Sequence, residues 1–571
     1  MRFSRLAEYF SRIEATPKRL EITAILAELL KESSPEEIDK ICYLVLGQLA
    51  PLYEGVEFNL AGKMLIRVMA EAYMVPGAEV EKITKEKGDL GDAAELLAQQ
   101  SRVHSSQLTV GQVYTKLREV AEDSGAGSSA RKVQGMAELF RSLDPLSVRY
   151  VARIPVASLR LGFSDKTILD ALSVAEVGNK SLRPVIERAY NVSADIGRIA
   201  KLVKSQGVKS LEKIEVEVGV PVRMASAERL PTPAEIIEKM GGKLAAEPKY
   251  DGFRVQVHVE GREVKIFSRN LENTTLMFPD IVEAVQKLPA KSLIMEGEAI
   301  AFNPETEEFE PFQETTKRKR KYGVAEKATE LPLKVFCFDL LYLNGRDLTR
   351  ETYEKRRAEL VKLIEEPNTL VVAEEKVFTD AKELEKFFME NIEHGLEGIV
   401  AKRLDGVYQA GVRNFNWVKL KRVEEGKLED TIDCVVLGYY TGRGKRTQFG
   451  IGGFLVGVYD ERNDVFKTIS RVGSGLTDEE WREMKKRVDE LKTKEKPKNA
   501  DVAKEHTPDV WADPRIVVAI RADEITKSPL HTAGGLALRF PRLMAFRDDK
   551  EPGQATTVAE VEKMFREQKK R

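Results

Sequence analysis

The sequence has few of the residues that build disulfide frameworks or zinc centres. It contains 3 cysteines and 5 histidines among 571 residues. Cys42, Cys337 and Cys434 are far apart in the chain, so we expect neither a disulfide-stabilised fold nor a cysteine-rich zinc site. The histidines show no paired ligand spacing either.

Long apolar segments are also missing from the sequence. The first ten residues lack the apolar core of a signal peptide, and no run of residues approaches the length of a membrane span. We therefore expect a soluble, cytoplasmic protein that has no membrane partner.

Neither sign of charge dominates. The 91 Lys and Arg residues balance 92 Asp and Glu residues, and the formal net charge of -1 provides no overall positive field for nucleic acid. Any nucleic-acid contact must come from local basic patches. Charged residues make up 32% of the chain, against about 25% in ordinary soluble domains. Such an excess is typical of thermophilic proteins.

Hydrophobic patterning divides the chain into three zones. Residues 1–215 show helical periodicity almost throughout, residues 216–425 mix short alternating strands with helices, and residues 426–571 contain β-like runs such as 431–440 and 453–459 before a final helix over 558–568. We predict a multidomain chain with an all-α domain, an α+β domain and a small β-barrel. Periodicity alone favours a simple packing role for the first zone.

A hairpin is predicted in the middle zone. Residues 253–260 alternate between apolar and polar, Gly261-Arg262 forms a two-residue turn, and residues 263–269 return. If Glu260 pairs with Glu263, Arg254 lies opposite Arg269, an unfavourable pair unless an anion such as a nucleotide phosphate lies between them. Alternatively, both arginines face water, or a shift of one residue separates them.

The segment Glu247-Pro248-Lys249-Tyr250-Asp251-Gly252 precedes this hairpin. A lysine acts as a nucleophile only when its amine is deprotonated, which burial or nearby positive charge favours. The surrounding strands would place Lys249 in a pocket near Arg254. Because the pattern Lys-any-Asp-Gly is short, on its own it indicates only a surface turn.

Further motifs follow Lys249 in a fixed order. They are Phe-Ser-Arg-Asn at 267–270, Ile-Met-Glu-Gly-Glu at 294–298, the β-like run 335–345, Glu-Gly-Ile-Val at 397–400, Trp-Val-Lys-Leu-Lys at 417–421, Leu-Arg-Phe-Pro-Arg at 538–542 and Arg-Asp-Asp-Lys at 547–550. This ordered series resembles the covalent nucleotidyltransferase superfamily of DNA ligases, RNA ligases and mRNA capping enzymes. Over nearly the whole chain, the pattern looks most like the archaeal and eukaryotic replicative ATP-dependent DNA ligases.

The resemblance implies a domain organisation and an activity. It implies a helical DNA-binding domain over 1–215, an adenylation (nucleotidyltransferase) domain over 216–425, and an OB-fold β-barrel with a C-terminal helix over 426–571. Such an enzyme uses ATP and Mg²⁺ to seal nicks in duplex DNA through lysine–AMP and adenylated-DNA intermediates. It serves DNA replication, repair and recombination, and the DNA-binding role replaces the simple packing role of the first zone.

The resemblance also assigns site residues. Lys249 would attack the α-phosphorus of ATP, Glu247 and its backbone would help define the adenine pocket, and Phe338 would stack on the base. The remaining implied ATP or AMP contacts are Arg254, Arg269, Glu298, Arg413, Lys419, Lys421, Arg539 and Lys550, with Asp549 beside the last of these.

These contacts would divide the work between different parts of the substrate. Arg254, Arg269 and Glu298 would hold the ribose and later the 5′-phosphate of the nick. Lys419 and Lys421, two apart on a strand, would clamp the α-phosphate from one side. The barrel would supply Arg539 and Lys550 to orient the leaving pyrophosphate. Glu397, together with Glu298, would hold the magnesium ion.

The implied partner is nicked double-stranded DNA, bound by a monomer associated with the nucleoid. Related archaeal ligases carry a sliding-clamp motif of a glutamine followed by paired aromatics, but the corresponding residues 100–104 lack the aromatic anchors. Whether and where this chain binds a sliding clamp is therefore left open. The basic run 317–321 is either a solvated surface or a contact to the phosphate backbone. Whether ADP, NAD or GTP replaces ATP is left open.

Three alternatives to a ligase fit the sequence less well. A capping enzyme uses GTP and RNA ends, and would not carry a helical DNA-binding domain of this length. An NAD-dependent ligase is expected to carry a cysteine zinc cluster, which three scattered cysteines do not supply. A catalytically silent, DNA-encircling scaffold would not need Lys249, Glu298, Glu397 and Lys419 together.

Overall fold

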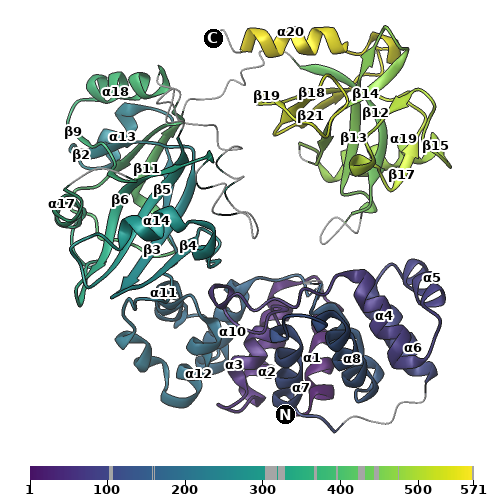
Figure 1. Ribbon diagram of the computed structural model, residues 1–571, viewed down its shortest axis with the longest axis horizontal. Helices are drawn as coiled ribbons and strands as arrows, with labels where there is room; N and C mark the ends of the chain where they lie inside the picture. Colours follow the sequence, from purple (N-terminus) through teal and green to yellow (C-terminus); the bar gives the residue numbers. More distant parts are fainter. Residues whose placement is uncertain are drawn as a thin grey trace. The chain divides into compact units, whose positions relative to one another are not determined.

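The computed structural model describes residues 1–101, 107–156, 159, 161–302, 315, 318, 324, 328, 330–365, 369–393, 396–421, 431–442, 449–473 and 475–568. These residues form two compact units, Met1–Lys421 and Arg422–Arg571 (Figure 1). Most of the clamp-related stretch 100–104 and of the basic run 317–321 lies outside the described residues.

The first part of unit 1 is helical, as its periodicity predicts. In α1, residues Phe3, Leu6, Phe10 and Ile13 recur at helical spacing, and all four are buried. The helices share one apolar core. They are α1 (Phe3–Glu14), α2 (Arg19–Glu32), α3 (Ile38–Leu44), α4 (Gly62–Tyr73), α5 (Gly77–Lys87), α6 (Leu90–Gln100), α7 (Val110–Glu122), α8 (Ser128–Arg141), α9 (Pro145–Arg153), α10 (Asp165–Val177), α11 (Arg183–Ser193) and α12 (Ile196–Gln206).

Two β-sheets follow in unit 1. One has the strand order β4-β3-β5-β6-β7, with β8 also paired to β6, and the other has the order β1-β11-β10-β2-β9. The strands are β1 (Ser226–Arg229), β2 (Leu244–Pro248), β3 (Phe253–Glu260), β4 (Glu263–Ser268), β5 (Ser292–Ala301), β6 (Leu333–Leu343), β7 (Arg346–Asp347), β8 (Leu370–Val372), β9 (Lys376–Phe378), β10 (Gly398–Lys402) and β11 (Arg413–Lys421).

Each sheet has its own helical cover. Helices α14 (Pro279–Val285) and α17 (Tyr353–Leu363) contribute to the core of the six-stranded sheet, while α13 (Pro233–Lys239) and α18 (Ala381–Glu393) contribute to the core of the five-stranded sheet. A further apolar cluster joins the two sheets, because it contains Ile294 and Leu341 from one and Trp417 from the other. Two residues of the motifs belong to this junction, because Trp417 is part of the cluster and Phe338 packs against it.

The predicted hairpin is confirmed. Strands β3 and β4 pair in the expected register, from Glu260 opposite Glu263 to Val255 opposite Ser268. The ladder ends one step short of Arg254 and Arg269, so these two arginines flank its open end.

Unit 2 is rich in β-structure. Its main sheet has the order β15-β17-β12-β13-β14-β16, with β18 paired to both β12 and β21, while β19 and β20 form a separate pair. The elements are β12 (Ile432–Tyr440), β13 (Gly453–Asp460), β14 (Val465–Val472), α19 (Asp478–Glu490), β15 (Lys492–Thr493), β16 (Ala500–Asp501), β17 (Val510–Ala512), β18 (Val517–Arg521), β19 (Glu524–Lys527), β20 (Leu536–Arg539), β21 (Arg542–Phe546) and α20 (Val558–Gln568).

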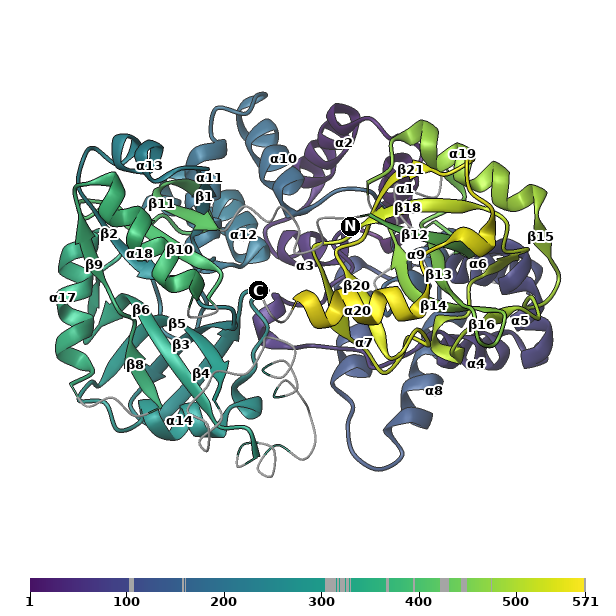
Figure 2. The ribbon, with the colours of Figure 1, turned by 90° about the horizontal axis from the view of Figure 1, so that it is seen from above.

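Several elements of unit 2 match the sequence prediction closely. Strands β12 and β13 agree with the predicted runs to within one residue at each end, and α20 has the predicted bounds. Helix α20, drawn in yellow in Figure 2, packs against β13 and β19. Among the described residues, the strand pairings do not close this sheet into a barrel.

Among the described residues, no helix combines the length and the apolar character needed to cross a bilayer.

A buried ion pair fixes α17 on β6. The Arg356 guanidinium donates to both carboxylate oxygens of Asp339, at 2.7 and 3.0 Å, and both side chains are fully buried. Its remaining nitrogen donates to the carbonyls of Glu351 and Gly406. Asp339 is thereby neutralised directly beside Phe338.

Arg356→Met should lower the free energy of unfolding of this region by about 3–5 kcal/mol, because it leaves a buried carboxylate without its partner. The control, Arg346→Met, removes an exposed pair between β7 and the same helix, formed with Glu359 at 3.2 Å, and should cost less than about 1 kcal/mol. Hydrogen-exchange protection of β6 and α17 in the full chain measures both. Equal losses in the two variants would contradict the account.

Candidate active site

Backbone pairing fixes Lys249 at the end of β2. Strands β2 and β10 are antiparallel, with Pro248 opposite Ile399. The pairing continues one residue further, because the Lys249 N–H donates to the Gly398 carbonyl at 2.8 Å and the Glu397 N–H donates to the Lys249 carbonyl at 3.1 Å. Lys249 and Glu397 are therefore held opposite each other by the main chain.

Their side chains form an ion pair, and Lys421 joins it. The Lys249 ammonium contacts the Glu397 carboxylate, and the Lys421 ammonium lies 2.7 Å from the same carboxylate. Burial raises the pKa of Glu397, but the two ammonium groups lower it by more, so the net shift is downward. Glu397 is thus held as a carboxylate.

Further positive charge lies around Lys419, the neighbour of Lys421 on β11. Burial lowers the pKa of Lys419, and the nearby positive charges of Arg413, Lys421, Lys249 and Arg269 lower it further. The structure therefore brings together cations from β11, from the turn after β4 and from the end of β2. An array of this kind binds polyanions such as phosphate chains.

Gly252 shows why the lysine motif ends in glycine. A Cβ atom at this position would lie 2.5 Å from the Ala299 carbonyl oxygen and 2.7 Å from Ile300 on β5. Only glycine allows the segment after Lys249 to approach β5 this closely. This approach brings Glu298 of β5 near Lys249. Burial raises the pKa of Glu298 to about 7, although Arg254 and Lys249 oppose the shift.

Arg254 has a protein partner that the sequence did not indicate. Its guanidinium donates to the fully buried carboxylate of Glu296 at 2.9 Å and to the Ala225 carbonyl at 2.8 Å. Gln256 and Tyr408 also donate to Glu296, each at 3.0 Å. The positive charge of Arg254 is therefore balanced within the protein, and no phosphate between it and Arg269 is required.

The residues expected around adenine lie on a buried cluster. Phe338 packs edge-on against Trp417, with ring centroids 5.9 Å apart, and the Arg254 guanidinium lies 5.3 Å from the Phe338 centroid. Glu247 is buried. Its carboxylate accepts a hydrogen bond from the Tyr353 hydroxyl at 2.6 Å and forms an ion pair with the Lys402 ammonium at 2.7 Å. Burial raises the pKa of Glu247, and the positive charges of Lys402 and Arg357 oppose that shift.

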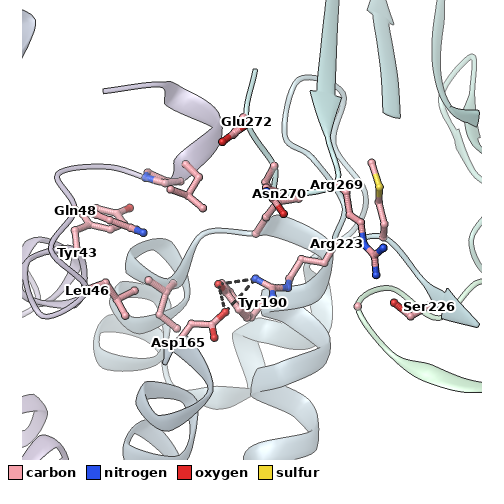
Figure 3. Close-up of a pocket in the computed structure, with 17 residues that line it drawn as sticks. Tyr43, Leu46, Gln48, Asp165, Tyr190, Arg223, Ser226, Arg269, Asn270 and Glu272 are labelled. Carbon is pink, nitrogen blue, oxygen red and sulfur yellow. Dashed lines mark hydrogen bonds and ion pairs between the residues drawn. The ribbon is translucent and has the colours of Figure 1, made fainter. Parts of the chain in front are cut away.

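A cavity of about 620 Å³ lies in unit 1 beside Arg269. Helical residues line one side of it, while Arg269 and Asn270 line another. Figure 3 shows Arg223 directed toward Tyr190 and Asp165, and its guanidinium donates to both, at 2.9 and 3.1 Å. The cavity thus connects the helical part of unit 1 with one member of the cation array.

The candidate residues of unit 2 make their own ion pairs. Arg539 at the end of β20 donates to Glu524 at 2.5 Å, and Lys550 donates to Asp433 at 2.5 Å. Asp549 pairs with Arg547 at 2.7 Å. Both candidate cations therefore have carboxylate partners within the unit.

The sequence matches family models along most of its length. The matched models are DNA ligase N terminus over residues 2–173, ATP dependent DNA ligase domain over residues 224–421, and ATP dependent DNA ligase C terminal region over residues 447–550. The chain belongs to the ATP-dependent DNA ligase family. The resemblance inferred from the ordered motifs is therefore confirmed.

Full-length relatives of this ligase agree. A protein named Probable DNA ligase from Dictyoglomus turgidum is 51% identical over 578 residues, covering 100% of this chain and 98% of the relative. DNA ligase 2 from Thermofilum pendens is 42% identical over 590 residues, covering 100% and 98%. A solved structure called Pmar-Lig_PreS3 has a similar fold, with a TM-score of 0.56 at 19% identity, covering 95% of this chain and 99% of that one.

Proposed function

We propose that this ATP-dependent DNA ligase seals nicks through AMP carried on Lys249. The observation that carries the proposal is the position of Lys249, which the main chain holds against Glu397 within the cation array. The positively charged side chains around Lys249 can bind the phosphates of ATP and so bring them to the lysine. The substrates are ATP and duplex DNA with a 5′-phosphate and a 3′-hydroxyl at the nick.

The reaction runs in three in-line displacements. First, the Lys249 Nζ forms a bond to the α-phosphorus of ATP, the bond to pyrophosphate breaks, and the amine gives up a proton. Second, a 5′-phosphate oxygen of the nick attacks the same phosphorus and releases Lys249. Third, the 3′-hydroxyl loses its proton, attacks the 5′-phosphorus and expels AMP. Positioning and charge neutralisation supply most of the catalysis.

Each residue of the cation array has a role in these steps. The Lys249 amine leaves its ion pair with Glu397 before it attacks, because a paired ammonium has no free electron pair. Lys419, Lys421 and Arg413 hold the phosphate oxygens. Arg269 holds the ribose and then the 5′-phosphate.

Arg254 and the residues of unit 2 orient parts of the substrate away from the α-phosphate. Arg254 acts from its pair with Glu296, so it orients the ribose side of the pocket without being drawn away from its carboxylate. Arg539 and Lys550 orient the leaving pyrophosphate.

We assign Glu397 and Glu298 to the magnesium ion. Both are carboxylates beside the phosphate-binding cations, and Mg²⁺ prefers one or two carboxylates together with substrate phosphate and water. The described residues hold no group of three or more acidic, histidine or cysteine ligands, which suits an ion that substrate helps to bind. When bound, the ion neutralises charge on the phosphate chain.

We propose a three-domain division of the chain as well. Residues 1–215 bind duplex DNA, residues 216–425 carry out adenylation, and residues 426–571 form an OB-fold barrel with a C-terminal helix. The separate matches of the three family models within these ranges support the division. The antiparallel succession β12-β13-β14 with α19 packed nearby is typical of small barrels that bind nucleic acid.

The cellular setting follows from this assignment. We propose that the ligase acts as a monomer on DNA in the cytoplasm, at the nucleoid, in replication, repair and recombination. The absence of aromatic anchors in residues 100–104 argues against a conventional clamp motif at that position.

Lys249→Ala should abolish covalent labelling of the protein by α-labelled ATP, because it removes the attacking amine. Binding of nicked DNA should be largely retained, because phosphate contacts along the duplex dominate affinity. Lys239→Ala, an exposed lysine in the same unit, is the control and should label normally. Labelling of Lys249→Ala at the wild-type level would refute the assignment.

Replacing both Arg539 and Lys550 with alanine should depress lysine adenylylation by about 10²-fold or more, as expected when charge stabilisation is lost from a transition state. Sealing of a pre-adenylated nick should fall far less, because pyrophosphate takes part only in the first step. Single-turnover rates on the two substrates separate these effects, with Arg515→Ala, an exposed residue of unit 2, as the control. Equal loss in both steps would show a role in folding or DNA contact instead.

A further inference from the structure

Lys402 is a buried cation that the mechanism above does not use. It is the last residue of β10, its backbone lies between Ala245 of β2 and Trp417 of β11, and the residue is 1% exposed. Burying an ammonium is costly unless it is paired and hydrogen-bonded. The contacts that compensate this cost therefore indicate what Lys402 does.

The polar contacts of Lys402 are with the two residues assigned to adenine. Its ammonium lies 2.7 Å from one carboxylate oxygen of Glu247 and donates to the Phe338 carbonyl at 2.9 Å. The other Glu247 oxygen accepts from the Tyr353 hydroxyl. One side chain thus links the carboxylate of the proposed base pocket to the backbone of the proposed stacking residue.

Three aromatic rings surround the same ammonium. Its nitrogen lies 4.9 Å from the centroid of Phe338, 4.7 Å from that of Tyr353 and 4.7 Å from that of Trp417. These rings come from β6, α17 and β11. Cations at such distances attract aromatic faces, so Lys402 restrains the Phe338 ring as well as its backbone.

The charge of Glu247 also bears on base choice. A carboxylate accepts hydrogen bonds, which matches the exocyclic amino group of adenine, whereas guanine presents a carbonyl oxygen at the corresponding position. A protonated carboxyl would instead donate a hydrogen bond to that guanine carbonyl, and so would allow guanine to bind. Burial favours the protonated form of Glu247, and Lys402 opposes it.

We infer that Lys402 is a positioning residue for base recognition, which holds Phe338 and the Glu247 carboxylate in the arrangement that selects adenine over guanine. The inference rests on the proposed function, because it assumes that Phe338 and Glu247 face the base. Among the described residues, the ion pair and hydrogen bond of the Lys402 ammonium are with Glu247 and Phe338, and not with Lys249 or the cation array. Its loss should therefore affect nucleotide affinity and choice more than the rate of the chemical step.

The test compares Lys402→Met, which keeps the side-chain length but removes the charge, with Lys402→Arg, which keeps the charge. The matched control is Lys376→Met on β9, since Lys376 also pairs with a carboxylate and lies 4.8 Å from a ring centroid, but is exposed. Single-turnover labelling with α-labelled ATP and α-labelled GTP gives KM and the maximal rate for each nucleotide. Thermal unfolding of each variant monitors folding, and Lys402→Gln, whose amide still donates to Glu247, replaces Lys402→Met if the latter is unfolded.

For Lys402→Met we expect KM for ATP to rise and the preference for ATP over GTP to fall, each by about tenfold or more. A change of this size matches the net contribution of about one hydrogen bond to binding. The maximal rate with ATP should stay within a few-fold of wild type, Lys402→Arg should restore part of the preference, and Lys376→Met should change nothing. An unchanged preference in a folded variant, or equal loss with both nucleotides, would overturn the inference.

The same assay separates this inference from the proposed function. Lys249→Ala is labelled in parallel with the Lys402 variants. If Lys249→Ala stays silent while Lys402→Met retains full selectivity, only the role of Lys402 is wrong. If Lys249→Ala becomes labelled, the proposed function itself fails.

Discussion

The backbone pairing between the end of β2 and the start of β10 is the constraint on which the active site depends. Two main-chain hydrogen bonds hold Lys249 opposite Glu397, and the neighbouring strand β11 places Lys419 and Lys421 beside them. The cations would repel one another without an anion, and Glu397 provides the counter-charge that the structure shows for Lys249 and Lys421. A substrate phosphate chain can replace that counter-charge, so the free site is already arranged for its ligand.

Three buried ion pairs support the residues that are assigned to the nucleotide. Glu296 neutralises Arg254, Asp339 neutralises Arg356, and Glu247 pairs with Lys402. Each pair connects two different strands or a strand and a helix, and each lies beside a residue assigned to the nucleotide. Removing one partner leaves an uncompensated charge in the interior, which is why such pairs fix geometry strictly even where they add little net stability.

The sequence predicted those elements of this ligase that depend on interactions between residues close together in the chain. The register of the β3–β4 hairpin and the bounds of α20 followed from alternation, turn residues and helical periodicity. The order of the motifs identified the candidate site residues. The partner of Arg254 was not predicted, because Glu296 is 42 positions away and only strand order brings them together. The aromatic surroundings of Lys402 depend in the same way on the meeting of β6, α17 and β11, to which no spacing in the sequence points.

The proposed function depends on AMP being carried on Lys249, and locating the adduct tests this most directly. After incubation of the unaltered protein with ATP and magnesium, peptide mapping by mass spectrometry should find one AMP on the peptide that contains Lys249. The link should be labile in acid and stable in base, because it joins nitrogen to phosphorus. AMP on another residue, or a link that survives acid, would contradict the account.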